Sequence, residues 1–157
     1  MTVAALVVTL AWTAVVASAE QTPRAFIQET ADEVLAVLKD GSLSSDQKLR
    51  RIEDIAYARF DFDTIAKLVL ARNWRKLTPE QQKEFIEEFK RHLSVTYGRN
   101  IESYRNETIE ITGDREEARG DWTVKSKIIR GGGDDILVDY RLRKSDAGQW
   151  KVIDVTI

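Results

Sequence analysis

Residues 78–104 read TPEQQKEFIEEFKRHLSVTYGRNIESY, and this stretch decides the fold. Thr78, Pro79 and Gln81 supply a cap, a first-turn proline and a capping-box partner, which are typical of the start of a helix. The apolar residues that follow recur every three or four positions and form one stripe, while charged side chains take the opposite face. The stripe consists of Phe85, Ile86, Phe89, Leu93, Tyr97, Ile101 and Tyr104. The pattern predicts an amphipathic helix about 40 Å long, which needs an apolar partner of similar length.

Three shorter helices are predicted before the long one. Residues 23–38 carry apolar side chains at helical spacing. Ser44 or Ser45 is placed to cap a second helix, and Asp61 or Asp63 to cap a third. The first half of the chain is therefore expected to be helical.

After Tyr104 the period of the apolar residues changes from about 3.6 to 2, which is typical of strands with one buried face. Three such segments lie within residues 109–143, and a fourth begins at Trp150. Short turns rich in Gly and Asp, at 131–134 and 145–148, join the later segments. Helices followed by strands, without βαβ alternation, predict an α+β fold. We expect N-terminal helices, including the long amphipathic one, packed on a C-terminal twisted antiparallel sheet of about four strands.

One face of this sheet is expected to be dry and to be crossed by the long helix. Its members are Trp122, Val124, Val138, Tyr140, Trp150 and Val152. In the fourth strand, the alternation points Ile153, Val155 and Ile157 to the other face, so that strand needs cover on both sides. The sequence reaches residue 157 in mid-strand. We therefore expect further C-terminal elements, which makes residues 20–157 a single, C-terminally truncated domain.

The composition indicates one ordinary globular domain and excludes several functions. The chain has 157 residues, 43% of them hydrophobic, and a formal net charge of -2. Its 24 Lys and Arg residues are interleaved with 26 Asp and Glu residues, so no basic field predicts a nucleic-acid partner. There is no cysteine, and His92 is the single histidine, which leaves little for a zinc site or a catalytic triad. We predict neither a metal nor a cofactor.

The first nineteen residues differ from the rest. Residues 3–16 are almost wholly apolar but too short for a comfortable membrane span, and Ala17-Ser18-Ala19 before Glu20 has the form of a signal peptidase site. These features predict a signal peptide over residues 1–19 and a mature protein outside the cytoplasm. An N-terminal anchor helix is the alternative.

Several segments together resemble the MlaC family, also called the toluene-tolerance auxiliary proteins. They include Phe60-Asp61-Phe62-Asp63, residues 69–75 (VLARNWR), residues 78–82 (TPEQQ), the stripe that follows, and residues 150–155 (WKVIDV). Their order and spacing cover nearly all of the mature chain. Two residues depart from the family pattern: Ala71 replaces a usual Gly, and Ile153 replaces a usual Tyr. The family's C-terminal helices are absent as well.

The resemblance implies a monomeric, non-enzymatic carrier in the periplasm. Such a carrier takes a glycerophospholipid from an outer-membrane lipoprotein–porin complex and delivers it to an inner-membrane ABC transporter complex, which maintains outer-membrane lipid asymmetry. A paralogous branch associated with hopanoid metabolism is similar and is an alternative.

The resemblance implies that residues of the apolar stripe and of the dry sheet face line a cavity for lipid tails. The candidates are Phe89, Leu93, Tyr97, Ile101, Tyr104, Trp122, Val124, Val138, Tyr140, Trp150 and Val152. Core packing explains the same residues on sequence grounds. Arg72, Arg75 and Lys76 form a basic cluster that suits a lipid head group or a partner surface, with a solvated face as the alternative.

Two other functions remain open from the residues alone. Helices followed by a curved sheet also describe cone-shaped α+β enzymes, in which Asp61 or Asp63 would be a general base. Helix capping is the competing explanation of both carboxylates. The second alternative is an interaction module with a filled core.

Overall fold

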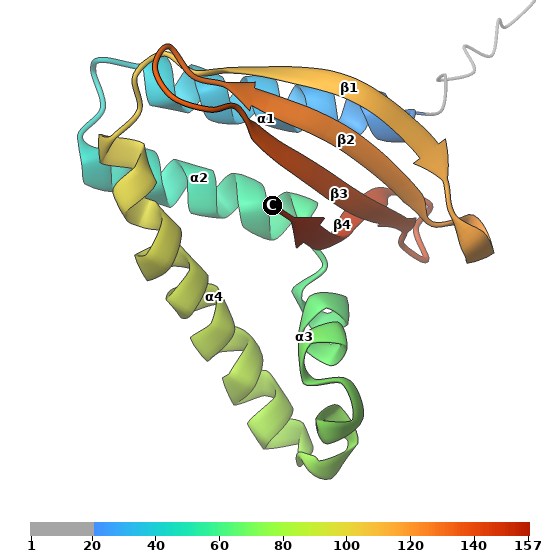
Figure 1. The fold of residues 1–157 in the computed structure, drawn as a ribbon. Coiled ribbons are helices and arrows are strands. Elements are labelled where there is room, and N and C mark those ends of the chain that lie inside the picture. The colour runs from blue at the N-terminus through green and yellow to red at the C-terminus, as the bar shows by residue number, and fades with distance from the viewer. Residues whose placement is uncertain (1–20) are drawn as a thin grey trace, which may run out of the picture.

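The computed structural model describes residues 21–157, including all their side chains except those of residues 99, 100 and 102. The predicted signal peptide lies outside these residues. The fold class is confirmed, because helices precede an antiparallel sheet of order β1-β2-β3-β4 (Figure 1). The elements are α1 (Pro23–Lys39), α2 (Ser45–Arg59), α3 (Phe62–Leu70), the 3-10 helix η1 (Ala71–Lys76), α4 (Pro79–Glu102), β1 (Thr108–Glu116), the 3-10 turn η2 (Ala118–Gly120), β2 (Trp122–Ile129), β3 (Ile136–Lys144) and β4 (Trp150–Thr156).

Side-chain caps begin all four α-helices. Thr22 accepts a hydrogen bond from the Ala25 amide at the start of α1. Ser44 and Thr78 each form a complete capping box at α2 and α4. Asp61 accepts a hydrogen bond from the amide of the third residue that follows it, at the start of α3. The two capping choices that the sequence left open are thus decided in favour of Ser44 and Asp61.

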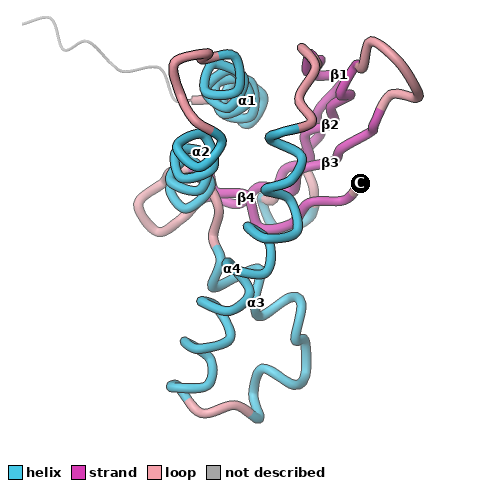
Figure 2. The backbone as a smooth tube through the Cα atoms, turned by 90° about the vertical axis from the view of Figure 1, so that its left-hand side faces the viewer, coloured by secondary structure: helices cyan, strands magenta, loops and turns pink. Residues whose placement is uncertain are grey.

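Helix α1 covers the dry face of the sheet, and this corrects the expected position of the long helix. The buried cluster there contains Phe26, Ile27, Ile111, Val124, Leu142, Trp150 and Val152. Helix α1 packs against β1 and β2, whereas α4 packs against α2 and α3. Figure 2 shows α1 and α2 side by side on one side of the sheet. The stripe on α4 is as apolar as predicted, but its spacing carries no information about which partner it meets.

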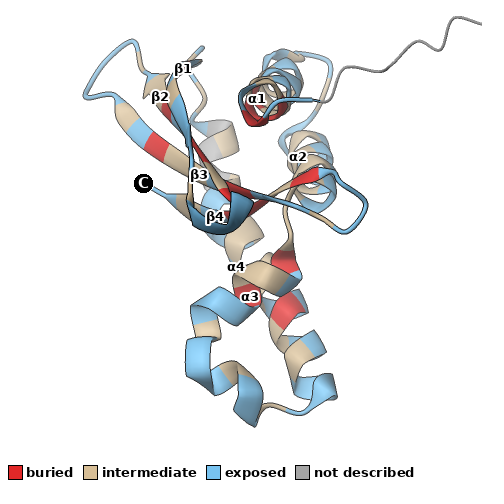
Figure 3. Cartoon of the chain, turned by 90° about the vertical axis from the view of Figure 1, so that its right-hand side faces the viewer, coloured by how far each residue is buried: buried red, intermediate tan, exposed pale blue. Residues whose placement is uncertain are grey.

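A second, smaller core lies in a helical lobe made of α3, η1 and α4. Phe62, Ala66 and Ile86 are its buried members. Figure 3 shows buried residues in two separate places, on α1 with the strands and on α3 with α4. Phe60 packs against both clusters, and the amide of the next residue donates to the Val152 carbonyl at 2.9 Å. The sheet and the lobe therefore meet at the junction of α2 and α3.

A bulge in β4 changes which residues share the dry face. Arg141 pairs with Asp154, but Leu142 pairs with Val152, which leaves Ile153 as an extra residue. Val155 then lies opposite Tyr140 and shares its face. The strict alternation expected from the sequence, which placed Val155 on the outer face, is corrected by this bulge.

An ion pair at the buried Asp121 carboxylate lies at the start of β2. Asp121 is 1% exposed and accepts two hydrogen bonds from the Arg143 guanidinium, at 2.6 and 2.7 Å. Arg141 Nε lies 3.3 Å from the same carboxylate. The hydrogen bonds from Arg143 hold the pKa of Asp121 below its usual value. They tie the turn before β2 to the outer face of β3.

Candidate functional site

An apolar groove of about 460 Å³ lies where α2, α3 and α4 approach the middle of β3 and the C-terminal end of β4. It occupies the seam between the two cores. Its lining residues are Leu49, Ile52, Glu53, Ala56, Tyr57, Phe60, Phe62, Ile65, Val69, Phe89, Lys90, Leu93, Ser94, Tyr97, Gly98, Ile101, Tyr140, Asp154, Val155 and Ile157.

Helix α4 forms the longest wall of the groove. Its contribution extends from Phe89 to Ile101, a length of about 18 Å at 1.5 Å per residue. Helices α4 and α2 come close at Gly98, where a Cβ would lie 3.4 Å from a methyl carbon of Leu49, a van der Waals contact. Several lining side chains remain accessible, including Tyr97 at 50% and Val69 at 56% exposure. The groove is therefore open to solvent along one side.

Few polar groups interrupt the groove. The Ser94 hydroxyl donates to Glu53, and burial together with the Glu53 charge raises the pKa of the Tyr57 hydroxyl. Burial also raises the pKa of Tyr140, although a hydrogen bond with Ser126 opposes the shift. Both phenols are therefore neutral at physiological pH.

The structure brings five of the eleven predicted tail-cavity residues to this groove. They are Phe89, Leu93, Tyr97, Ile101 and Tyr140. All but Tyr140 come from the stripe of α4, which faces the seam, where Tyr140 and Val155 of the sheet also lie.

The other six lie elsewhere. Val124, Trp150 and Val152 belong to the filled core under α1, and Val138 is 3% exposed. Trp122 donates its indole N–H to Asp114 at 3.0 Å. The Tyr104 hydroxyl lies 3.4 Å from the Glu107 carbonyl oxygen.

Helices α2 and α3 form two further walls of the groove, which were not predicted from the sequence. Leu49, Ile52 and Tyr57 come from α2, and Ile65 and Val69 from α3. The sequence contained one sign of the α3 wall: this helix has more apolar residues than packing against a single neighbouring element requires. Leu68, beside Val69, is 53% exposed.

The remaining candidates do not line the groove. Arg72, Arg75 and Lys76 are exposed in η1, at the far end of the helical lobe, and Lys76 Nζ donates to the Asn73 side-chain oxygen at 2.9 Å. A role for this cluster on a partner surface stays a prediction.

The acidic candidates and the histidine have other positions. Both carboxylate oxygens of Asp61 accept hydrogen bonds from Thr64, at 2.9 Å from its amide and 2.6 Å from its hydroxyl. Asp63 lies exposed in the first turn of α3, and His92 is exposed on α4. Helix capping accounts for Asp61.

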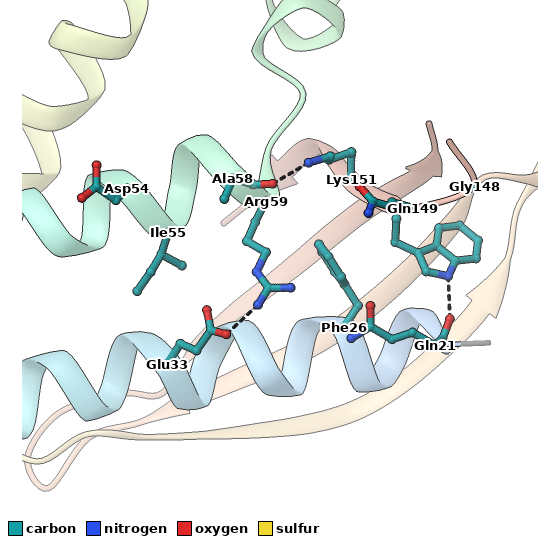
Figure 4. Close-up of a pocket in the computed structure, with 11 residues that line it drawn as sticks. Gln21, Phe26, Glu33, Asp54, Ile55, Ala58, Arg59, Gly148, Gln149 and Lys151 are labelled. Atoms are coloured by element: carbon teal, nitrogen blue, oxygen red, sulfur yellow. Dashed lines mark hydrogen bonds and ion pairs between the residues drawn. The ribbon is translucent and has the colours of Figure 1, made fainter. Parts of the chain in front are cut away.

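A second cavity, of about 540 Å³, lies between α1, α2 and the β3–β4 turn (Figure 4). Arg59 pairs with Glu33 at 2.6 Å across it, with its guanidinium 5.2 Å from the centroid of the Phe26 ring. Lys151 donates to the Ala58 carbonyl at 2.5 Å, and the Trp150 indole donates to the Gln21 carbonyl at 2.9 Å. The Arg59–Glu33 ion pair crosses this cavity and hydrogen bonds link its walls, so fatty chains would have to bury charged groups there.

Comparison with known proteins identifies the family. The family model described as MlaC protein matches residues 28–157. The chain belongs to the MlaC family. It is 31% identical over 157 residues to the toluene tolerance protein Ttg2D of Pseudomonas putida, across 97% of this chain and 73% of that protein.

A solved MlaC-like structure shares the fold. The phospholipid-binding protein from Ralstonia solanacearum, determined in complex with a phospholipid, matches with a TM-score of 0.75 and 29% identity. The match covers 85% of this chain and 76% of that one. Within residues 21–157, no helix has both the length and the apolar character needed to span a membrane.

Proposed function

We propose that this MlaC protein is a phospholipid carrier that holds acyl tails in the apolar groove. The proposal rests on the shape and the apolar lining of this groove. It is an open trough of about 460 Å³, walled by apolar side chains of three helices and β4. A site of this kind provides burial and requires no covalent step, so the proposed function is binding and transfer instead of catalysis.

The dimensions of the groove suit a fatty chain. Its α4 wall is about 18 Å long, while one leaflet of a bilayer's hydrocarbon core is about 15 Å thick. The tails of a diacyl lipid contain about thirty methylenes at ~0.8 kcal/mol each, so leaving a membrane for water costs on the order of 20 kcal/mol. A carrier has to replace most of that burial.

The family likeness supports the same ligand class. The Ralstonia solanacearum protein of the same fold was solved with a phospholipid bound. We further propose that the carrier is a periplasmic monomer and exchanges glycerophospholipid with an outer-membrane lipoprotein–porin complex and an inner-membrane ABC transporter complex. Transfer between apolar sites has little net cost, so those partners set its direction and thereby maintain outer-membrane lipid asymmetry.

Native mass spectrometry of the exported full chain tests the proposal. We expect a copurifying glycerophospholipid that is released when the protein is denatured. A protein that remains empty after incubation with phospholipid vesicles would contradict it.

A pair of neighbouring residues on α3 provides a matched control. Val69 lines the groove and is 56% exposed, whereas Leu68 is 53% exposed and lies outside the groove lining. Val69→Asp introduces a charge where tails are proposed to lie, so retained lipid should fall roughly tenfold or more. Leu68→Asp should leave lipid occupancy unchanged. Equal occupancy in both variants would place the tails elsewhere.

A further inference from the structure

Lys90 marks one end of the apolar groove. Its ammonium lies 5.3 Å from the centroid of the Tyr57 ring and 5.5 Å from that of Phe62, and its side chain is 23% exposed. Aromatic faces attract a cation and hold it in place. Lys90 is the only cationic side chain among the groove-lining residues that the structure describes, and the other charged ones, Glu53 and Asp154, are acidic.

A polar cleft lies on the other side of the same lysine. This cleft has a volume of about 260 Å³ and opens between α3, η1 and α4. Its charged and amide side chains are Asp63, Gln82, Lys83, Glu87 and Lys90. The apolar groove and the polar cleft thus meet at the Lys90 ammonium. An amphiphile needs this arrangement at the junction of its tails and its head group.

The protein partner of Lys90 is easily displaced. Lys90 Nζ lies 2.9 Å from Glu87 Oε1, and the Glu87 side chain is 63% exposed. Exposed pairs of this kind contribute little to stability. A phosphate that takes the ammonium would leave the Glu87 carboxylate, with Asp63 in the same cleft, available for a cation of the ligand.

We propose that Lys90 binds the lipid phosphate and that Glu87 binds a head-group ammonium, so that phosphatidylethanolamine is the preferred ligand class. The proposal rests on the carrier function proposed above. One ion pair is exchanged for two: Lys90–Glu87 is replaced by Lys90–phosphate and Glu87–ammonium. The tails then run from Lys90 along α4 toward Ile101.

The test uses the lipid-stripped full chain and vesicles of equal parts phosphatidylethanolamine and phosphatidylglycerol with identical acyl chains. Native mass spectrometry measures the total lipid bound and the ratio of the two classes. For the wild type we expect a several-fold excess of phosphatidylethanolamine. Glu87→Gln should bring the ratio close to one, and Lys90→Met, which keeps the apolar stem, should lower the total about tenfold, the scale of one charge-assisted hydrogen bond.

The neighbouring ion pair on α4 is the control. Arg91 and Glu88 have the same spacing and form a pair, but neither lines the groove or the cleft. Arg91→Met and Glu88→Gln should therefore change neither readout. If Lys90→Met fails to fold, Glu87→Gln, at an exposed position, decides the question alone.

Two outcomes are distinguishable. A wild type that binds both lipids equally, with Glu87→Gln and Lys90→Met unchanged, overturns the head-group assignment and leaves the carrier function standing. A wild type that binds neither lipid overturns the carrier function itself.

Discussion

Ala71 occupies a backbone conformation that glycine adopts most easily. It ends α3 with φ 46° and ψ -122°, outside the regions that side chains with a Cβ favour. The MlaC family, by resemblance, usually has Gly at this position. In this chain the backbone has a glycine-like conformation while the residue carries a Cβ.

We expect Ala71→Gly to stabilise the protein. Relief of the backbone strain is worth about 1–3 kcal/mol, and the greater entropy of glycine in the unfolded chain offsets about 0.5–1 kcal/mol of it. The net gain in unfolding free energy should be about 1 kcal/mol, measured by urea denaturation. Ala118→Gly is the control, since Ala118 is exposed and is not among the positive-φ residues. It should lower stability slightly, and a similar loss in Ala71→Gly would contradict the strain argument.

The indole N–H groups of two tryptophans have hydrogen-bond partners of different kinds. The indole N–H groups of Trp122 and Trp150 need polar partners or a wet cavity when they are shielded from solvent. Each has a partner, at Asp114 and at the Gln21 carbonyl. The requirement was predictable from chemistry, but the partner of Trp150 is 129 residues away in the chain and was not.

At the scale of elements, two amphipathic helices have different tasks. Helix α1 fills the dry face of the sheet, and α4 forms a wall of the groove. Periodicity predicted both helices and the apolar face of each. Periodicity does not tell which of the two helices covers the sheet, because a sheet face accepts any apolar stripe of suitable length. Which helix packs there depends on how the chain connects the elements.

Two Ile→Ala substitutions separate these tasks. Ile27 on α1 is 3% exposed, so Ile27→Ala should cost about 2–5 kcal/mol of unfolding free energy and leave lipid occupancy of the folded protein unchanged. Ile101 on α4 is only partly buried and lines the groove. Ile101→Ala should cost less stability and lower lipid occupancy. Denaturant titration and native mass spectrometry give the two readouts, and lipid loss in Ile27→Ala alone would reverse the assignment.

The β4 bulge is the clearest element that the sequence did not predict. One extra residue, Ile153, moves Val155 onto the face of Tyr140 and into the groove lining. The alternation in fact shifts phase at Val152-Ile153, where two apolar residues are adjacent. A strict period of 2 overlooks this shift, and pairing with β3 accommodates it as a bulge.

At the scale of the whole molecule, residues 21–157 form two hydrophobic cores with a groove at their seam. Phe60 packs against both cores and lines the groove. Its ring stacks near Phe62, with centroids 6.0 Å apart. In this arrangement each core is packed, and the groove lies between the two cores.

We expect Phe60→Ala to uncouple the two cores. The substitution removes the side chain common to both, at a cost of about 3 kcal/mol. Urea unfolding should then show two transitions, with the helical lobe unfolding first, by tryptophan fluorescence and circular dichroism. Phe85→Ala is the control because Phe85 packs against the lobe core alone, and it should shift a single transition to lower urea. One coincident transition in Phe60→Ala would show that other contacts couple the cores.

The sequence by itself determined the helices, the strands, their order and the cap of α4, and it narrowed the caps of α2 and α3 to two residues each, because these depend on side chains within a few residues of one another. It also determined that α4 is apolar along one side, and residues such as Leu93 and Ile101 were therefore predicted for the site. Only the tertiary structure decided that α1 takes the sheet face, that α2 and α3 complete the groove, and that Val124 and Val152 are core. The physical reason is that burial of an apolar stripe is favourable against any apolar surface, so its partner is selected by packing between segments far apart in the chain.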